Sequence, residues 1–351
     1  MFARYKNTSL ILGLIGVTVA CVIHAVPISP PFWTQGGADL DDAFRMTWAI
    51  PDTNEVSVPG RNGFTYDAWI DWGDTTAVAA VTAWNDADLT HSYADAPCNP
   101  QIVITGVFGT IYFNGGGDRL LVTSVDNMGD VGWETLQKSF FSCDNLLRVL
   151  DNGASEMGQV VYLNTVFDEC DLLTNVQGGT WVLTNVLEVA NAFEANTLKT
   201  LDMSSWDLQE ATSLRRLAYQ AFAWDGPGLS TIGSNVTTAV EIYHWCYALA
   251  DDLSAVVNYS TQLTVWSSIS ASNMSYSATN GFFSTNVMDG FDCSFLSQVF
   301  NSNEITRILQ DLDTSGATNG AYNSGGVNDD PTAAGWEAKT NLVAKGWTVT
   351  T

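Results

Sequence analysis

The sequence predicts a mainly β protein with short helices, in which a small β-sandwich-like module is followed by a solenoid of short repeats. Two patterns carry this prediction. Polar and apolar residues alternate with a period of two between residues 44 and 113, as in half-buried strands. Beyond that region an aromatic residue recurs every 25–29 residues, which is typical of stacked repeat units. Apolar residues make up 46% of the 351 residues, enough for a sizeable folded core.

Residues 1–25 are organised as an export signal. Two basic residues precede an apolar run from Leu10 to Ile23, and the small residue Ala25 offers a cleavage site. We expect cleavage there, with retention as an N-terminal anchor or lipidation of Cys21 as alternatives. Residues 26–40 are rich in Pro and Gly and predict a linker. Export predicts a secreted or cell-surface protein.

The predicted β module covers residues 41–113. Its strand-like segments FRMTWAI, FTYDAWIDW and QIVITGVFGTIYF are separated by the turn clusters PGRNG and DAPCNP. Within it, AWIDWGDTT followed by THSYA resembles the polycystic-kidney-disease (PKD) type of β-sandwich domain, although Thr75 stands where that family has glycine. The residues that match the family are Asp71, Trp72, Gly73, Asp74, His91 and Tyr93.

Asp71, Asp74 and His91 form a candidate acid and base group, because paired carboxylates with a histidine can transfer protons. The alternative is that the aspartates hold a strand-end turn by accepting hydrogen bonds from backbone N–H groups. We favour the turn. The sequence also lacks a nucleophile elbow of the G-x-S-x-G type, so we expect no catalytic residues and no enzymatic activity.

The repeat region is expected over residues 114–315, with about 25–29 residues per unit. Phe140-x-x-Cys143 recurs 27 residues later as Phe167-x-x-Cys170. Each unit is expected to place its aromatic residue on a short helix or turn and a Leu/Val pair on a short strand, so that equivalent side chains stack. The predicted ladder residues are Phe140, Cys143, Phe167, Cys170, Phe193, Asn196, Phe222, Tyr247 and Phe300.

These units resemble the BspA-like class of bacterial surface proteins with leucine-rich repeats. FFSCDNL and FDECDLL match the F-x-x-C-x-x-L of that family, and LDMSSWDLQEATSL matches its I-S-x-W-D-x-S-x-V-T-x-M. TSVDNMGDVGWETLQKSF resembles the segment that opens its repeats, and residues 316–351 resemble the closing, capping segment. The resemblance implies a leucine-rich-repeat-type solenoid on an exposed, non-enzymatic surface protein used for adhesion or recognition.

Cys170 lies between Glu169 and Asp171, and neighbouring carboxylates raise the pKa of a thiol rather than activate it. Because Cys143 and Cys170 occupy the same position of neighbouring units, their Cα atoms should stack at about 4.8 Å, within disulfide range. A rung-to-rung disulfide is therefore one interpretation. The other, which we favour, is a ladder of small buried side chains.

The chain carries 38 acidic against 13 basic residues, a formal charge of −25, which disfavours nucleic acid and anionic membrane surfaces as partners. We expect no cofactor and no metal. Calcium is an alternative at DLDTSG, residues 311–316, which begins like a calcium loop. Tyr322, however, stands where such a loop needs a bidentate Glu.

Candidate binding residues are tryptophans that fall in or beside successive units, because exposed indole rings stack on sugars and proteins. The alternative, which is the commoner one for such residues, is that they fill the core or its edge. They are Trp181, Trp206, Trp224, Trp245 and Trp266. The sequence therefore predicts recognition, through the solenoid, of a protein or glycan on a host or neighbouring cell surface. One alternative is a structural or receptor-binding component of a virion or phage; another is an extracellular carbohydrate-active enzyme with an accessory β module.

Overall fold

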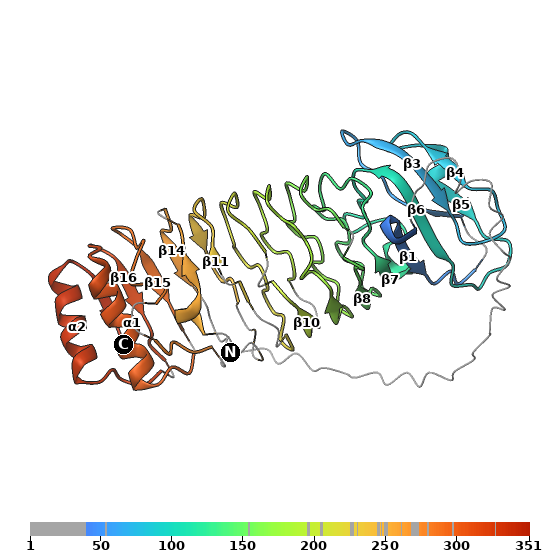
Figure 1. Ribbon diagram of the computed structural model, residues 1–351. Helices are drawn as coiled ribbons and strands as arrows, with labels where there is room; N and C mark the ends of the chain where they lie inside the picture. The colour runs from blue at the N-terminus through green and yellow to red at the C-terminus, as the bar shows by residue number, and fades with distance from the viewer. Residues whose placement is uncertain are drawn as a thin grey trace, which may run out of the picture. The chain divides into compact units, whose positions relative to one another are not determined.

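The described part of the chain begins after the predicted signal and nearly all of the predicted linker (Figure 1). The computed structural model describes residues 40–52, 55–153, 155–194, 197–203, 206–224, 228–229, 231–243, 246, 248, 252–260, 262–267, 274–278, 281–296, 298–326 and 328–351. A short 3-10 helix, η1 (Leu40–Asp42), opens it.

Four antiparallel strands form the first half of the largest sheet. They lie in the order β1 (Phe44–Trp48), β6 (Gln101–Phe108), β3 (Tyr66–Asp71) and β4 (Ala79–Val81). β2 (Glu55–Ser57) and β5 (Thr90–Ser92) pair in a separate two-stranded sheet, and η2 (Ala87–Leu89) precedes β5. Along β3 buried and exposed residues alternate, as the period-two pattern of FTYDAWIDW predicts.

The large sheet continues directly into the repeat region. After η3 (Arg119–Leu121), β7 (Val122–Asn127) pairs antiparallel with β1 and parallel with β8 (Arg148–Val149). β9 (Asn175–Val176) and β10 (Thr200–Leu201) add further parallel strands, giving the order β10-β9-β8-β7-β1-β6-β3-β4.

A second parallel line of strands runs along the later units. Isolated bridges from Tyr162 through Glu188 and Ser213 reach Thr238 in β12 (Thr238–Ala239). From there the five-stranded sheet continues in sequence order with β14 (Val265–Ser267), β15 (Asp292–Ser294), β16 (Ala321–Asn323) and β17 (Thr348–Thr350). β11 (Thr231–Ile232) pairs with β13 (Val257–Asn258), which follows η4 (Leu253–Ala255).

Two α-helices lie in the C-terminal part of the described chain, α1 (Ser302–Ser315) before β16 and α2 (Ala333–Ala344) before β17 (Figure 1). Asn301 and Glu304 form a capping box at the start of α1, so that each side chain accepts a hydrogen bond from the other residue's backbone N–H. Gly316 ends the helix with a φ of 79°, the left-handed conformation that glycine adopts without strain.

The predicted fold class, a mainly β chain with a sandwich-like module followed by a leucine-rich-repeat-type solenoid, is wrong. The described residues form a mixed α/β structure with an eight-stranded mixed sheet, a five-stranded parallel sheet and two α-helices. β7 joins the predicted module and the repeat region in one sheet. Full helices, rather than short turns, connect the last three parallel strands, and the first of them, α1, begins at a capping box.

Backbone hydrogen bonds give the true register of the repeats. In each unit the backbone N–H of the aromatic position donates to a carbonyl oxygen in the next unit. The acceptor is the residue just before the equivalent aromatic position, as for Phe140 N and Val166 O at 3.0 Å. We call this set the aromatic column; it consists of Phe113, Phe140, Phe167, Phe193, Ala218 and Tyr243. The ring centroids of Phe140 and Phe167 lie 5.5 Å apart, and those of Phe167 and Phe193 lie 5.6 Å apart.

Four predicted ladder residues are not found in the ladder: two are replaced by other residues, one lies elsewhere and one falls outside the described residues. Ala218 occupies the position predicted for Phe222, which is 46% exposed instead, because a lone alanine gives no aromatic signal to align. Tyr243 takes the place predicted for Tyr247; Tyr247 and Asn196 lie outside the described residues. Phe300 is buried, but beside the start of α1, where its ring meets Phe295 at 5.3 Å.

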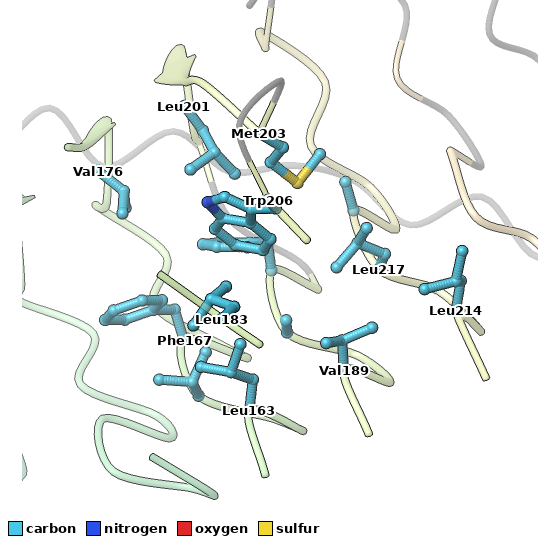
Figure 2. Packing of buried hydrophobic residues seen from close by; sticks show 14 of the residues in the cluster. Leu163, Phe167, Val176, Leu183, Val189, Leu201, Met203, Trp206, Leu214 and Leu217 are labelled. Atoms are coloured by element: carbon cyan, nitrogen blue, oxygen red, sulfur yellow. The ribbon is translucent and has the colours of Figure 1, made fainter. Parts of the chain in front are cut away.

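The interior of the stacked segments is filled by the side chains that recur once per unit. Figure 2 shows Trp206 lying among Leu183, Leu201 and Met203, with Phe167 and Leu163 nearby in the same core. Stacking therefore buries apolar faces that no single unit could bury alone.

Candidate functional site

The tryptophans predicted to bind partners do not offer exposed rings. Trp181, Trp206, Trp224 and Trp266 are all buried, so the expectation of exposed indole faces is wrong for these four. The indole N–H of Trp206 donates to Gly178 O at 2.8 Å, and that of Trp224 to Leu201 O at 2.9 Å. A tryptophan repeated at unit spacing fills the core here. Trp245 lies outside the described residues.

Asp71, Asp74 and His91 hold a turn. Asp71 accepts a hydrogen bond from Gly73 N at 2.9 Å, and Asp74 accepts one from Thr76 N at 2.8 Å. His91 Nε2 lies 2.7 Å from Asp74 Oδ2, and its ring stacks on Trp72 with centroids 5.0 Å apart. Burial opposes ionisation of Asp74, but hydrogen bonds from Thr76 and His91 hold its pKa below the usual value.

Cys143 and Cys170 are not joined by a disulfide, so the rung-to-rung bridge is wrong. Cys170 Sγ donates to Phe140 O at 3.0 Å, and Cys246 Sγ donates to Ala218 O at 2.7 Å. Each thus reaches the aromatic-column carbonyl of the preceding segment. Burial raises the pKa of Cys170, with a smaller contribution from Cys143.

The segment considered for calcium is helical. Residues 311–315 form the last turn of α1, where Asp311 is buried and accepts hydrogen bonds from Tyr276 Oη at 2.6 Å and Gly281 N at 2.8 Å. Asp313 instead pairs with Lys345 Nζ at 2.6 Å. The two carboxylates serve separate contacts. Across the described residues, no group of three or more His, Cys, Asp or Glu side chains is arranged to hold a metal ion.

An exposed tryptophan lies on the eight-stranded sheet, away from the predicted positions. Trp69 in β3 is 41% exposed and is directly paired with Thr105 in β6 and Ala80 in β4. Asp67 and Asp71 flank it at i−2 and i+2 and therefore point to the same side of the sheet. We call this surface, made of Asp67, Trp69, Asp71, Thr105 and Val107, the Trp69 face.

A hollow of about 360 Å³ opens beside the Trp69 face. β1 begins at Phe44, which pairs with Ile104 of β6. The C-terminal part of β6 therefore extends beyond β1, and residues 130–132 lie beside it instead. Phe108 N donates to Val131 O at 2.7 Å there. Thr105 and Val107 line the hollow, so it is continuous with the Trp69 face; the remaining lining residues are Asp42, Ala43, Gly106, Asp130, Val131 and Gly132.

Two glycines with positive φ line this hollow. Gly106 has a φ of 82°, and a Cβ there would lie 2.6 Å from the carbonyl oxygen of Asp67. Gly132 has a φ of 71°, and a Cβ there would meet Val107 Cγ1 at 3.4 Å. Both positions therefore need a residue without a side chain.

The exposure of Trp69 is indicated by the strand pattern around it. In FTYDAWIDW the buried phase is Tyr66, Ala68 and Ile70, so Trp69 falls in the polar phase between two aspartates. A large aromatic residue at a solvent-facing strand position is an informative exception to period-two burial.

Comparison of the chain with protein-family models, with characterised proteins and with solved structures finds no match. The described residues contain no helix that is both long and apolar enough to cross a membrane. The resemblances to BspA-like repeats and PKD domains stay predictions.

Proposed function

We propose that the protein is a secreted or cell-surface recognition protein, without enzymatic activity, which binds a protein or glycan of a host or neighbouring cell. The binding surface is the Trp69 face together with its adjoining hollow. The observation that carries this proposal is the 41% exposure of a large aromatic ring on a sheet face that also carries Asp67, Asp71 and Thr105.

Tryptophan on a flat sheet face suits recognition for a physical reason. Its ring offers a large, rigid contact area that costs little conformational entropy on binding, and tryptophan is enriched among residues that dominate binding energy. Asp67, Asp71 and Thr105 surround the ring with hydrogen-bonding groups that can orient a partner. The resemblance of FFSCDNL and FDECDLL to BspA-like surface proteins supports the same functional class.

A binding screen tests this proposal. The purified protein is applied to glycan and peptide arrays and compared with the variants Trp69→Ala and Trp84→Ala. Trp84 is a matched control because it is 43% exposed but lies outside the Trp69 face. We expect Trp69→Ala to lose the binding of the parent protein and Trp84→Ala to keep it. If Trp69→Ala binds every ligand as the parent does, the placement of the site is wrong.

A further inference from the structure

We propose that the protein has a second binding site, for a single neutral sugar ring, in a pocket between the loop before β3 and the first repeat units. The pocket has a volume of about 380 Å³ and is lined by Phe64, Glu134, Gln159, Val161 and Tyr162. None of these residues belongs to the Trp69 face or lines its hollow, so the two surfaces are separate.

Hydrogen bonds join the two walls of this pocket, so it is formed before a ligand binds. Thr65 N donates to Glu134 Oε1 at 2.9 Å, and Gly109 N donates to Thr65 O at 2.8 Å. Earlier in the same loop, Arg61 Nη1 donates to Gln137 Oε1 at 2.9 Å. A preformed site favours binding, because little conformational entropy is lost when the ligand arrives.

The carboxylate of Glu134 is held in position by its close neighbours. A Cβ at Gly109 would lie 2.6 Å from Glu134 Oε1 and 3.0 Å from Thr65 O, so only glycine allows these groups to approach. Oε1 accepts the hydrogen bond from Thr65, whereas Oε2 makes none with the described residues. Glu134 therefore keeps one oxygen with which to accept a hydrogen bond from a ligand.

Two further polar groups of the lining make no hydrogen bond with the described residues, the carboxamide of Gln159 and the hydroxyl of Tyr162. Gln159 is exposed, and Tyr162 is 36% exposed. The main chain of Tyr162 is fixed, because its carbonyl accepts from Leu136 N at 2.9 Å and it forms a bridge to Glu188. Carboxamides and hydroxyls both donate and accept, and so do the hydroxyls of a sugar.

The aromatic residues of the lining favour a sugar over a ligand that is polar on all sides. Phe64 packs against the hydrophobic core, and the ring of Tyr162 makes no aromatic or cation contact with the described residues. One face of a pyranose presents C–H groups, while its hydroxyls lie around the edge. Such a ligand can stack on an aromatic ring and make hydrogen bonds at the same time.

The charges around the pocket favour a neutral ligand. Of the described residues that line it, none is basic, so a phosphate or carboxylate would meet only the negative charge of Glu134. The guanidinium of Arg61 lies over the ring of Tyr112, 4.5 Å from its centroid, and also donates to Gln137. For a cation the lining offers a single carboxylate, which already accepts a hydrogen bond.

Titration of the whole protein with the methyl glycosides of glucose, galactose, mannose and N-acetylglucosamine tests this site. Binding is followed by saturation-transfer NMR. We expect at least one glycoside to bind with a Kd of about 1 mM, too weak to survive the washing of an array. Added salt should not change this Kd, because the ligand is uncharged.

Variants locate the bound sugar. Tyr162→Ala should weaken the affinity about tenfold because the stacking surface is lost, and Tyr162→Phe should have a smaller effect. Gln159→Ala should weaken it about threefold, the effect of one hydrogen bond. Tyr259→Ala and Gln262→Ala are the matched controls, because both residues are exposed and lie outside the pocket, and they should leave the Kd unchanged.

The contrary results are distinct from one another. If none of the four glycosides binds at about 20 mM, far above the expected Kd, the sugar site is overturned. Equal affinities in Tyr162→Ala and Tyr259→Ala would also overturn it. Binding that is kept in Tyr162→Ala but lost in Trp69→Ala would place the sugar on the Trp69 face, which overturns this site and supports the proposed function. Binding of tetramethylammonium through Tyr162, without any glycoside, would overturn the neutral ligand.

Discussion

At the scale of single residues, the stacked segments hold non-glycine residues in left-handed conformations at two fixed positions. One column consists of Lys138, Thr165, Asn191, Arg216 and Glu241, with φ between 51° and 58°. The other includes Ser142, Glu169 and Gln220, four residues further on, with φ between 57° and 63°. These positions bracket the aromatic column and turn the chain sharply on both sides of each buried ring.

Thr165 is the least suited of these residues, because a β-branched side chain at a φ of 57° is a steric outlier. We expect Thr165→Gly to stabilise the protein by about 0.5–1 kcal/mol, since relief of a left-handed penalty of about 1–2 kcal/mol outweighs the added entropy of the unfolded chain. Urea unfolding measures the change. Thr184→Gly, at an exposed position without positive φ, should destabilise instead. Equal losses in both variants would contradict the strain argument.

At the scale of elements, one carboxylate ties the antiparallel and parallel halves of the large sheet. Asp126 of β7 accepts hydrogen bonds from Thr47 of β1 at 2.5 Å, Gln101 of β6 at 3.1 Å and Ser124 at 2.8 Å. Arg148 of β8 lies 3.4 Å away. Burial opposes ionisation of Asp126, but these partners hold its pKa below the usual value.

Removal of this carboxylate should weaken the sheet where its two halves meet. We expect Asp126→Ala to cost about 2 kcal/mol of unfolding free energy, because it leaves several partly buried donors without an acceptor. Arg148→Ala should cost no more than about 0.5 kcal/mol, because its side chain is largely exposed and such ion pairs contribute little. Chemical denaturation compares the two variants. A loss in Arg148→Ala as large as that in Asp126→Ala would show that the ion pair, rather than the hydrogen bonds, is the main tie.

The elements also show what could be predicted from the sequence. β1, β3 and β6 lie within the three predicted strand segments. The stacking of Phe140 on Phe167 follows from their spacing of 27 residues in the sequence. The predicted register is wrong from Ala218 onwards, because an alanine at the aromatic position gives no pattern to align. The backbone hydrogen bonds of the column nevertheless continue through Ala218. α1 was missed even though Asn301 and Glu304 form a readable capping signal.

The candidate site was harder to predict than the strands. Spacing alone cannot tell a tryptophan that fills a core from one that faces solvent, so it points to the five repeated tryptophans and gives no indication of Trp69. The hollow depends on where β1 begins relative to β6 and on residues 130–132, which are distant in sequence from both. Only the three-dimensional register brings these residues together.

At the scale of the whole molecule, acidic groups set the dependence of stability on pH. Burial, with repulsion from Glu194 and Glu169, raises the pKa of Asp168 to about 7, and burial also raises the pKa of Glu194. A carboxyl whose pKa is raised on folding stabilises the folded state while protonated, and that contribution is lost as the pH rises through the raised value. The lowered pKa values of Asp74 and Asp126 act oppositely, because their contribution is lost in acid below the ordinary carboxyl range.

We therefore expect the protein to be more stable at about pH 5.5 than at about pH 8, and to lose stability again below about pH 4. Asp168→Asn should raise the stability at about pH 8 by on the order of 1 kcal/mol and flatten the decline between the two higher values. Urea midpoints across this range give the profile. A parent protein whose stability is flat from about pH 5.5 to about pH 8 would contradict the assignment of a buried, protonated Asp168.

Hydroxyl-radical footprinting of the exposed aromatic residues tests the Trp69 face most directly as a binding surface. Oxidation of Trp69, Trp84, Phe222 and Trp336 is measured by mass spectrometry with and without a ligand selected by the array screen, because all four residues are 41–46% exposed. We expect the ligand to protect Trp69 and leave the other three unchanged. Unchanged oxidation of Trp69 while the ligand is bound, or equal protection of all four, would contradict recognition through this face.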